Sequence, residues 1–179
     1  MFRDFRRRSL RAGGLVLTIL TLVPFATTGT VAAAGSVQAQ LAEVRAATAR
    51  YHDLDAALAD GYIPVSPCVA EAGLGGMGYH FLNPALIDGV IDPLQPEVLN
   101  YAPKPNGALR LVAVEYMLID ADQDLATDVD RPTLFGATFD GPMTGHGPGQ
   151  PVHYDLHAWI WEPNPAGMLA TWNARVDCP

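Results

Sequence analysis

The ten residues 152–161, VHYDLHAWIW, constrain the fold of this chain more than any other segment. They are rich in β-branched and aromatic residues, which predicts a β-strand. Successive side chains of a strand point to opposite faces, so the segment divides into two sets. The first set is apolar and predicts a core face: Val152, Tyr154, Leu156, Ala158 and Ile160. The second set is His153, Asp155, His157, Trp159 and Trp161. The segment is therefore expected to lie in a sheet whose one face packs on an apolar core while its other face carries these polar and aromatic side chains.

The polar set combines imidazoles and a carboxylate with two indoles, which is typical of a pocket where polar groups orient a ligand beside aromatic walls. His153 and His157 would lie about 13 Å apart on a flat strand, too far to share one metal ion. Neighbours two positions apart, such as His153 with Asp155, fit one ion better. We therefore expect only one of the two imidazoles to bind a metal directly, unless a bulge bends the strand.

Further candidate ligands lie elsewhere in the sequence. His80 follows the glycine-rich stretch GLGGMGY, which predicts a shaped loop, and His146 lies in GHGPGQP. Glu115 lies on a predicted strand whose same-face neighbours would be Leu111, Ala113 and Met117, and a carboxylate there is costly unless it is paired or ligating. We predict a metal site with ligands drawn from four histidines: His80, His146, His153 and His157.

In this metal site, Glu115 or Asp155 would complete the coordination shell or take a proton from a bound water. Zinc and copper are the expected ions because imidazole suits both. The leading hypothesis is a secreted metal-binding domain, which includes the case of a metal-dependent enzyme. A second is a non-enzymatic module in which Trp159 and Trp161 stack on a small-molecule ligand. A third is a structural or interaction protein whose histidines are polar core. The mutual distances of the side chains separate the three hypotheses.

The N-terminal segment, residues 1–34, has the order of a signal peptide: five arginines, an apolar run and small residues. The apolar run, Leu15 to Ala26, is shorter than the roughly 20 residues that span a bilayer. We expect cleavage after Ala34, with cleavage after Ala39 as the alternative. The start RRRSLR partly matches a twin-arginine signal, so both that route and the ordinary secretory route stay open. Either route predicts a secreted or extracytoplasmic protein.

Two cysteines in an exported chain are expected to pair. A bridge between Cys68 and Cys178 would close a loop of about 110 residues and contribute about 4–5 kcal/mol in the chain-entropy model. Ligation of a metal by both thiols is the alternative, although no CxxC pair supports it. The remaining 145 residues, 35–179, suit a single domain.

Residues 35–179 carry 18 acidic and 6 basic side chains, a net charge of −12. This charge disfavours binding to nucleic acid and to anionic membrane surfaces, and it favours cations. The acidic segment 120–130 begins with the spacing of an EF-hand loop, but Leu125 and Arg131 stand where that loop needs Gly and Glu. A solvated acidic loop is the simpler interpretation, with a weak calcium site as the alternative. The motif GxSxG and phosphate-binding loops are absent from the sequence.

The coarse organisation is a helical part, residues 35–61, followed by a β-rich part, residues 62–179. Apolar residues at spacings of three and four predict one helix over 36–60: Leu41, Val44, Ala47, Tyr51, Leu54 and Leu58. Segments 98–102 and 109–119 predict a hairpin around the turn KPNG, and 134–139 and 168–172 predict further strands. The expected fold class is α+β, with an N-terminal amphipathic helix packed on a mostly antiparallel β-sheet.

The sequence resembles a group of exported bacterial proteins of unassigned function. The segments that carry the resemblance include GMGYHF (76–81), LVAVEY (111–116) and PVHYDLHAWIW (151–161), and together with others they span most of residues 35–179. The resemblance implies that this part is a whole unit and implies no activity. Five candidate residues lie in these segments: His80, Glu115, His153, Asp155 and His157. The segment around His146 departs from the group's pattern.

Overall fold

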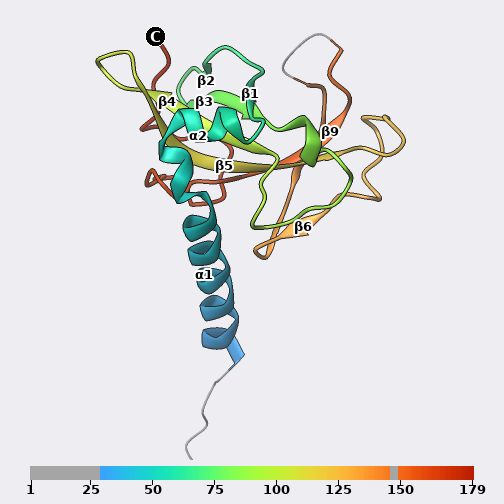
Figure 1. Ribbon diagram of the computed structural model, residues 1–179. Coiled ribbons are helices and arrows are strands. Elements are labelled where there is room, and N and C mark those ends of the chain that lie inside the picture. Colours follow the sequence, from blue (N-terminus) through green and yellow to red (C-terminus); the bar gives the residue numbers. More distant parts are fainter. Residues whose placement is uncertain (1–28, 146–148) are drawn as a thin grey trace, which may run out of the picture.

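The computed structural model describes residues 29–145 and 149–179. Its centre is a seven-stranded sheet with the order β1-β3-β4-β5-β9-β8, and β2 also pairs with β3 (Figure 1). The strands are β1 (Ile63–Pro64), β2 (Val69–Glu71), β3 (Gly75–Leu82), β4 (Val98–Pro103), β5 (Leu109–Ile119), β8 (Asp140–Met143) and β9 (His153–Ala158). Neighbouring strands pair antiparallel, and a helical segment packs on one face of the sheet. The α+β class is therefore confirmed.

The helical segment is divided, whereas the sequence predicted one helix over 36–60. It consists of α1 (Gly29–Thr48), the short 3-10 helix η1 (Ala49–His52) and α2 (Leu54–Ala59). Asp53 breaks the helix because its backbone is extended and its carboxylate accepts the N–H of Asp55, which makes it the N-cap of α2. The predicted stripe is buried at Leu41, Val44 and Tyr51.

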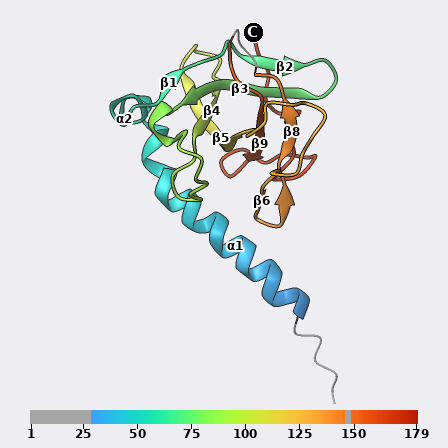
Figure 2. The same ribbon diagram turned by 90° about the vertical axis from the view of Figure 1, so that its right-hand side faces the viewer.

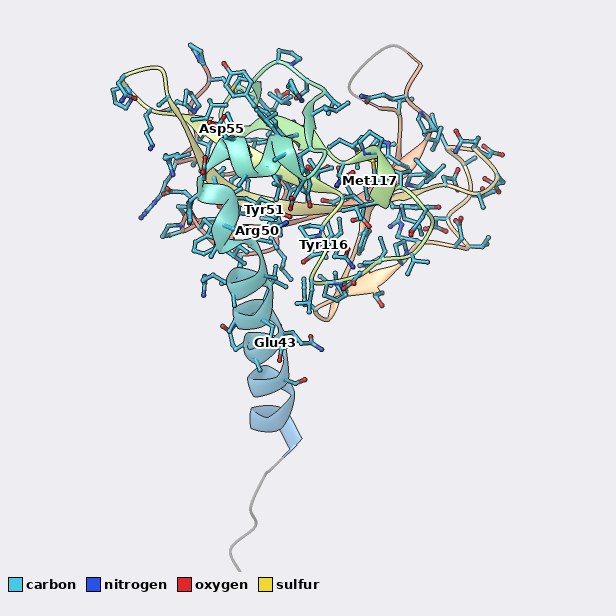
Figure 3. All side chains as sticks on the ribbon, in the orientation of Figure 1. Glu43, Arg50, Tyr51, Asp55, Tyr116 and Met117 are labelled. Carbon is cyan, nitrogen blue, oxygen red and sulfur yellow. A yellow bond between two sulfur atoms is a disulfide. The ribbon has the colours of Figure 1, made fainter. Side chains whose placement is uncertain are left out.

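The N-terminal turns of α1 extend away from the sheet in both ribbon views (Figures 1 and 2). Arg50 and Tyr51 lie where the helical segment meets the sheet, and Glu43 lies on α1, closer to its N-terminus and away from the sheet (Figure 3). The expected cleavage point, Ala34, falls within α1, and residues 1–28 of the expected signal peptide lie outside the described residues. Within the described part, every helix is too short or too polar to cross a membrane.

The predicted hairpin is confirmed. β4 and β5 pair antiparallel, and the turn between them is closed by the Lys104 N–H, which donates to the Ala108 carbonyl oxygen. Segment 134–139 is not one strand, because Phe135 and Gly136 both adopt positive φ and form a tight turn between β6 (Thr133–Leu134) and β7 (Ala137–Thr138). Segment 168–172 forms no strand.

The glycine-rich stretch before His80 is a strand, β3, and not the predicted loop. Its glycines permit unusually close backbone contacts. A Cβ on Gly78, which has a φ of +89°, would lie 2.4 Å from the Tyr101 carbonyl oxygen. A Cβ on Gly75 would lie 2.2 Å from the Asn173 carbonyl oxygen. The glycines therefore let β4 and the C-terminal segment approach β3, which places His80 on a rigid strand.

A β-bulge decides which residues of β5 share a face. Asn100 pairs with Ala113 and Tyr101 pairs with Leu111, so β5 has one extra residue, Val112, at this point. The Val112 carbonyl oxygen accepts the N–H groups of two residues beyond β9, Trp161 and Glu162. The expectation that Leu111 shares the face of Glu115 was therefore wrong: Leu111 packs in the core cluster on the helix side.

The disulfide Cys68–Cys178 is formed, with the two Cα atoms 5.5 Å apart, which confirms the predicted pairing. It holds the C-terminal segment against the sheet face opposite the helices. There Asn173 pairs with Gly76, and Val176 packs in a small second core cluster with Trp159. Disulfides persist in oxidising compartments, so the bridge fits an extracytoplasmic protein.

Candidate metal centre

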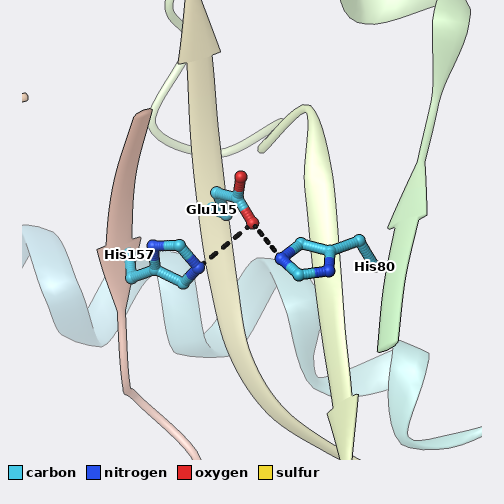
Figure 4. A group of neighbouring side chains, drawn as sticks. All are labelled: His80, Glu115 and His157. Atoms are coloured by element: carbon cyan, nitrogen blue, oxygen red, sulfur yellow. Dashed lines mark ion pairs between the residues drawn. The ribbon is translucent and has the colours of Figure 1, made fainter. Parts of the chain in front are cut away.

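Four adjacent strands bring the polar side chains to the face of the sheet opposite the helices. On β5, Glu115 lies directly opposite His157 of β9, and on β3, His80 lies opposite Asn100 of β4. Figure 4 shows both imidazoles pointing toward the Glu115 carboxylate, with His80 reaching across β4. The bulge at Val112 is what turns Glu115 to this face.

The three side chains form a compact and buried group. Glu115 Oε2 lies 3.4 Å from His80 Nε2 and 3.3 Å from His157 Nε2. All three ligand atoms lie within 4.8 Å of one another. The exposed fractions are 4% for His80, 1% for Glu115 and 1% for His157. We call these residues the His-Glu-His cluster.

These distances match the spacing of ligands around a tetrahedral ion. With metal–ligand bonds of about 2.0–2.1 Å, two tetrahedral ligands lie about 3.3–3.4 Å apart. The two distances to Glu115 Oε2 already have this value. Since the two imidazole nitrogens lie within 4.8 Å, a closure of at most about 1.5 Å between them would complete the arrangement. The cluster could therefore hold one metal ion.

Ser66 orients the His80 ring. The Ser66 hydroxyl lies 2.8 Å from the Pro67 carbonyl oxygen and 2.8 Å from His80 Nδ1. A carbonyl oxygen can only accept, so the hydroxyl donates to it and its oxygen accepts from Nδ1–H. Nε2 is then the ring nitrogen that faces Glu115. Hydrogen bonds of this kind fix the tautomer of metal-binding histidines.

Two further buried residues support the cluster. Asn100 Nδ2 donates to Glu115 Oε2 at 2.9 Å, which fixes the carboxylate. Asp155 Oδ1 lies 4.0 Å from His157 Nδ1, on the side of the ring away from Glu115. Burial raises the pKa of the Asp155 carboxyl well above its usual range, and the charges of Glu115 and Asp140 raise it further. Carboxylates often occupy this position behind a metal-binding histidine.

A cavity of about 290 Å³ adjoins the cluster, and His80 and Glu115 are part of its wall. Its apolar wall includes Val65, Leu82, Ile87, Val98, Met117 and Ile119. Among the described lining residues, Glu115 is the one acidic side chain, and neither lysine nor arginine is present. The wall of the cavity is thus mostly apolar, with Glu115 and His80 at the cluster and the polar side chains of Gln150 and His153 elsewhere in its lining.

His153 lines this cavity and does not belong to the cluster. It lies opposite Ile119 of β5, two residues along β9 from Asp155, which lies opposite Met117. The His153 side chain is 2% exposed. Its Nδ1 lies 3.1 Å from the Pro151 carbonyl oxygen, which can only accept, so Nδ1 carries a proton. The structure therefore separates the two histidines of β9, with His157 beside Glu115 and His153 further along the cavity.

The two indoles lie away from the cavity. β9 ends at Ala158, and Trp159 then donates its backbone N–H to Met168, which ends the alternation expected over 152–161. The Trp159 ring is buried and stacks on His157, with ring centroids 6.0 Å apart. Trp161 contacts His52 on the helix side of the sheet. Neither indole is among the residues that line the cavity.

His146 and the acidic segment 120–130 do not join the cluster. His146 lies outside the described residues, so its role stays a prediction from the sequence. In the acidic segment, Asp122 and Asp124 accept backbone N–H groups within the loop. Among residues 29–145 and 149–179, no group of three metal-binding atoms other than the His-Glu-His cluster converges this closely.

Ser66 and Asn100 were not among the sequence candidates. Asn100 is a polar residue in the predicted strand 98–102, whose other residues are apolar or aromatic. A polar side chain in such a strand is costly to bury unless it is paired, and the same argument had singled out Glu115. Ser66 lies in a short irregular segment, and its contact with His80 depends on the path of the chain between β1 and β2. No local pattern in the sequence encodes that contact.

Comparison with models of protein families, with curated proteins and with solved structures finds no match.

Proposed function

We propose that this protein is an extracytoplasmic metal-binding protein that holds one divalent transition-metal ion between His80, Glu115 and His157. The observation that carries the proposal is the approach of two buried imidazole nitrogens to within 3.4 Å of a single carboxylate oxygen. Two histidines and one glutamate are a familiar ligand set of catalytic zinc sites, where a fourth position stays open. The resemblance to exported proteins and the disulfide support the extracytoplasmic location.

Zinc is the favoured ion, ahead of copper. A square-planar copper(II) site with bonds of about 2.0 Å places neighbouring ligands about 2.8 Å apart, whereas a tetrahedral zinc site places them about 3.3 Å apart. The two distances to Glu115 Oε2, 3.3 and 3.4 Å, agree with the tetrahedral value. Because His80 and Glu115 also line the cavity, an open fourth position would face it. With an open coordination position that faces a cavity, the protein would also be suited to act as a metal-dependent enzyme.

The test is zinc affinity, measured on untagged, EDTA-stripped protein by competition with a chromophoric chelator. We expect His157→Ala to lower the affinity at least 100-fold, since it removes a direct ligand. Glu115→Gln should also weaken binding strongly while it preserves the size of the side chain. His153→Ala should cost no more than the roughly 10–100-fold typical of a residue outside the coordination shell.

The matched control is His52→Ala, which removes an exposed imidazole outside the cluster. It should leave the zinc affinity unchanged, and circular dichroism checks that every variant is folded. Wild-type protein that neither binds zinc or copper nor changes its melting temperature on their addition would refute the proposal. Equal and complete loss of affinity in His153→Ala and His157→Ala would overturn the assignment of ligands.

A further inference from the structure

The cavity beside the His-Glu-His cluster has the shape and polarity of a binding site for a small, elongated ligand. Its floor includes Glu115, Met117 and Ile119, alternate residues of β5 that share one face. Four residue steps along a strand span about 13 Å, so the cavity runs about this far from the cluster toward His153. The wall also includes Leu82 and Val98, which lie in register with Glu115 on the neighbouring strands.

The volume limits the size of the ligand. An apolar cavity of about 150 Å³ holds benzene, which has six non-hydrogen atoms. By the same proportion, 290 Å³ holds roughly ten to twelve such atoms. An extended eight-carbon chain is about 10 Å long, at about 1.25 Å per carbon, and the volume and the length of the cavity therefore indicate the same size of ligand.

The charges at the polar end decide the head group. A zinc ion with neutral imidazoles and the Glu115 carboxylate carries a net charge of +1. No lysine, arginine or second carboxylate is present among the described lining residues to change this balance. An anionic head group on the open coordination position would neutralise the charge, whereas an ammonium group would meet an uncompensated cation. Carboxylate oxygen is also an ordinary zinc ligand.

Resting on the metal site proposed above, we propose that the cavity binds a small monocarboxylate with an apolar body of about ten non-hydrogen atoms in all, its carboxylate on the metal ion. The apolar body would displace water from the wall beside Met117, and the carboxylate would occupy the position that three protein ligands leave open.

The experiment is isothermal titration of zinc-loaded protein with octanoate, acetate, octanol and octylammonium. Each buried methylene is worth about fourfold in affinity, so six methylenes would favour octanoate over acetate by up to about 4,000-fold. Ordering of the chain reduces this factor, and we expect at least 100-fold. Octanol should bind more weakly than octanoate, and octylammonium more weakly than octanol. Metal-free protein should lose the preference for octanoate over octanol.

Two variants locate the binding. Ile87→Trp fills the cavity from a partly exposed position on its wall and should abolish octanoate binding without change in zinc affinity. Val90→Trp introduces the same indole three residues away, at a side chain that is 65% exposed, and should behave as wild type.

The zinc titration separates the two proposals. If zinc binds and octanoate is not at least tenfold tighter than acetate, the monocarboxylate site is refuted and the metal site stands. If octanoate binds equally well to Ile87→Trp, the site lies elsewhere and the inference is likewise refuted. If zinc itself does not bind, the proposed function fails, and the carboxylate site fails with it.

Discussion

Glu97 offers a quantitative test of the described core. Its side chain is 1% exposed, and its Oε2 accepts the backbone N–H of Met117, a residue of the cavity floor. Burial raises the pKa of Glu97 to about 8, against the hydrogen bonds that lower it, and the charges of Asp88 and Glu115 add to the rise. The perturbation is Glu97→Gln, which keeps the shape and an acceptor for Met117 but cannot ionise.

The sign follows from proton binding. The unfolded chain loses the Glu97 proton near pH 4.5, whereas the folded protein keeps it until about pH 8. Between these values the folded state binds more protons, so its free energy of unfolding falls as the pH rises. The difference between the two pKa values corresponds to at most about 4.8 kcal/mol. Because the site can relax around the ionised carboxylate, we expect about 2–4 kcal/mol.

The assay is urea unfolding of metal-free wild type and Glu97→Gln at pH 5, 6, 7 and 8. The variant should gain stability relative to wild type by about 2–3 kcal/mol between pH 5 and pH 8, with equal m-values. Glu43→Gln, on the exposed part of α1, is the control and should follow wild type. Curves for wild type and Glu97→Gln that stay parallel within about 0.5 kcal/mol would refute the argument, since Glu97 would then ionise as an exposed carboxyl does.

Three further predictions concern the disulfide and the residues behind the proposed metal ligands. Replacing Cys68 and Cys178 by Ser should lower the free energy of unfolding by up to about 4–5 kcal/mol, because the bridge joins residues 110 positions apart, and thiol titration of native wild type should find no reactive thiol. Ser66→Ala should weaken zinc binding about 10–100-fold through loss of the hydrogen bond to His80, while the melting temperature of the metal-free protein stays the same; a large drop in that temperature would instead indicate damage to the fold. Asp155→Asn should weaken zinc binding by a similar factor yet stabilise the metal-free protein at neutral pH, because the folded state no longer carries a buried carboxyl with a raised pKa; a variant that is less stable than wild type would contradict this.

Much of the sheet could be predicted from the sequence because local patterns encode it. β4 and β5 flank a four-residue turn, and each is a mostly apolar run with few polar residues, so both their positions and the unusual polarity of Glu115 were visible. β3 was missed because glycines replace the side chains whose alternation would reveal a strand. Those glycines meet Asn173 and Tyr101, which are distant in sequence, and no local pattern records such contacts.

The sequence predicted which residues could bind a metal, but it did not predict which of them lie together in the folded protein. Glu115 stood out as a carboxylate on an apolar strand, His80 by the glycine-rich stretch before it, and His157 by its place in the polar set of residues 152–161. The spacing on β9 argued that only one of its two histidines would bind a metal directly. The choice of His157 depends on the register between β5 and β9, which sets it opposite Glu115. The face on which Glu115 lies depends on the bulge at Val112 in the pairing of β4 with β5, for which the sequence carries no local signal.

The position of β9 in the sheet has a consequence for how the protein is made. β9 is the last strand of the described chain, yet it lies inside the sheet between β5 and β8. During synthesis, β5 therefore emerges from the ribosome well before its neighbour, and its edge stays open for pairing with other chains. Glu115 is also present long before His157 joins it. The proposed metal site needs His157, so it can form only after β9 has joined the sheet, and a metal ion cannot guide the folding steps that precede this pairing.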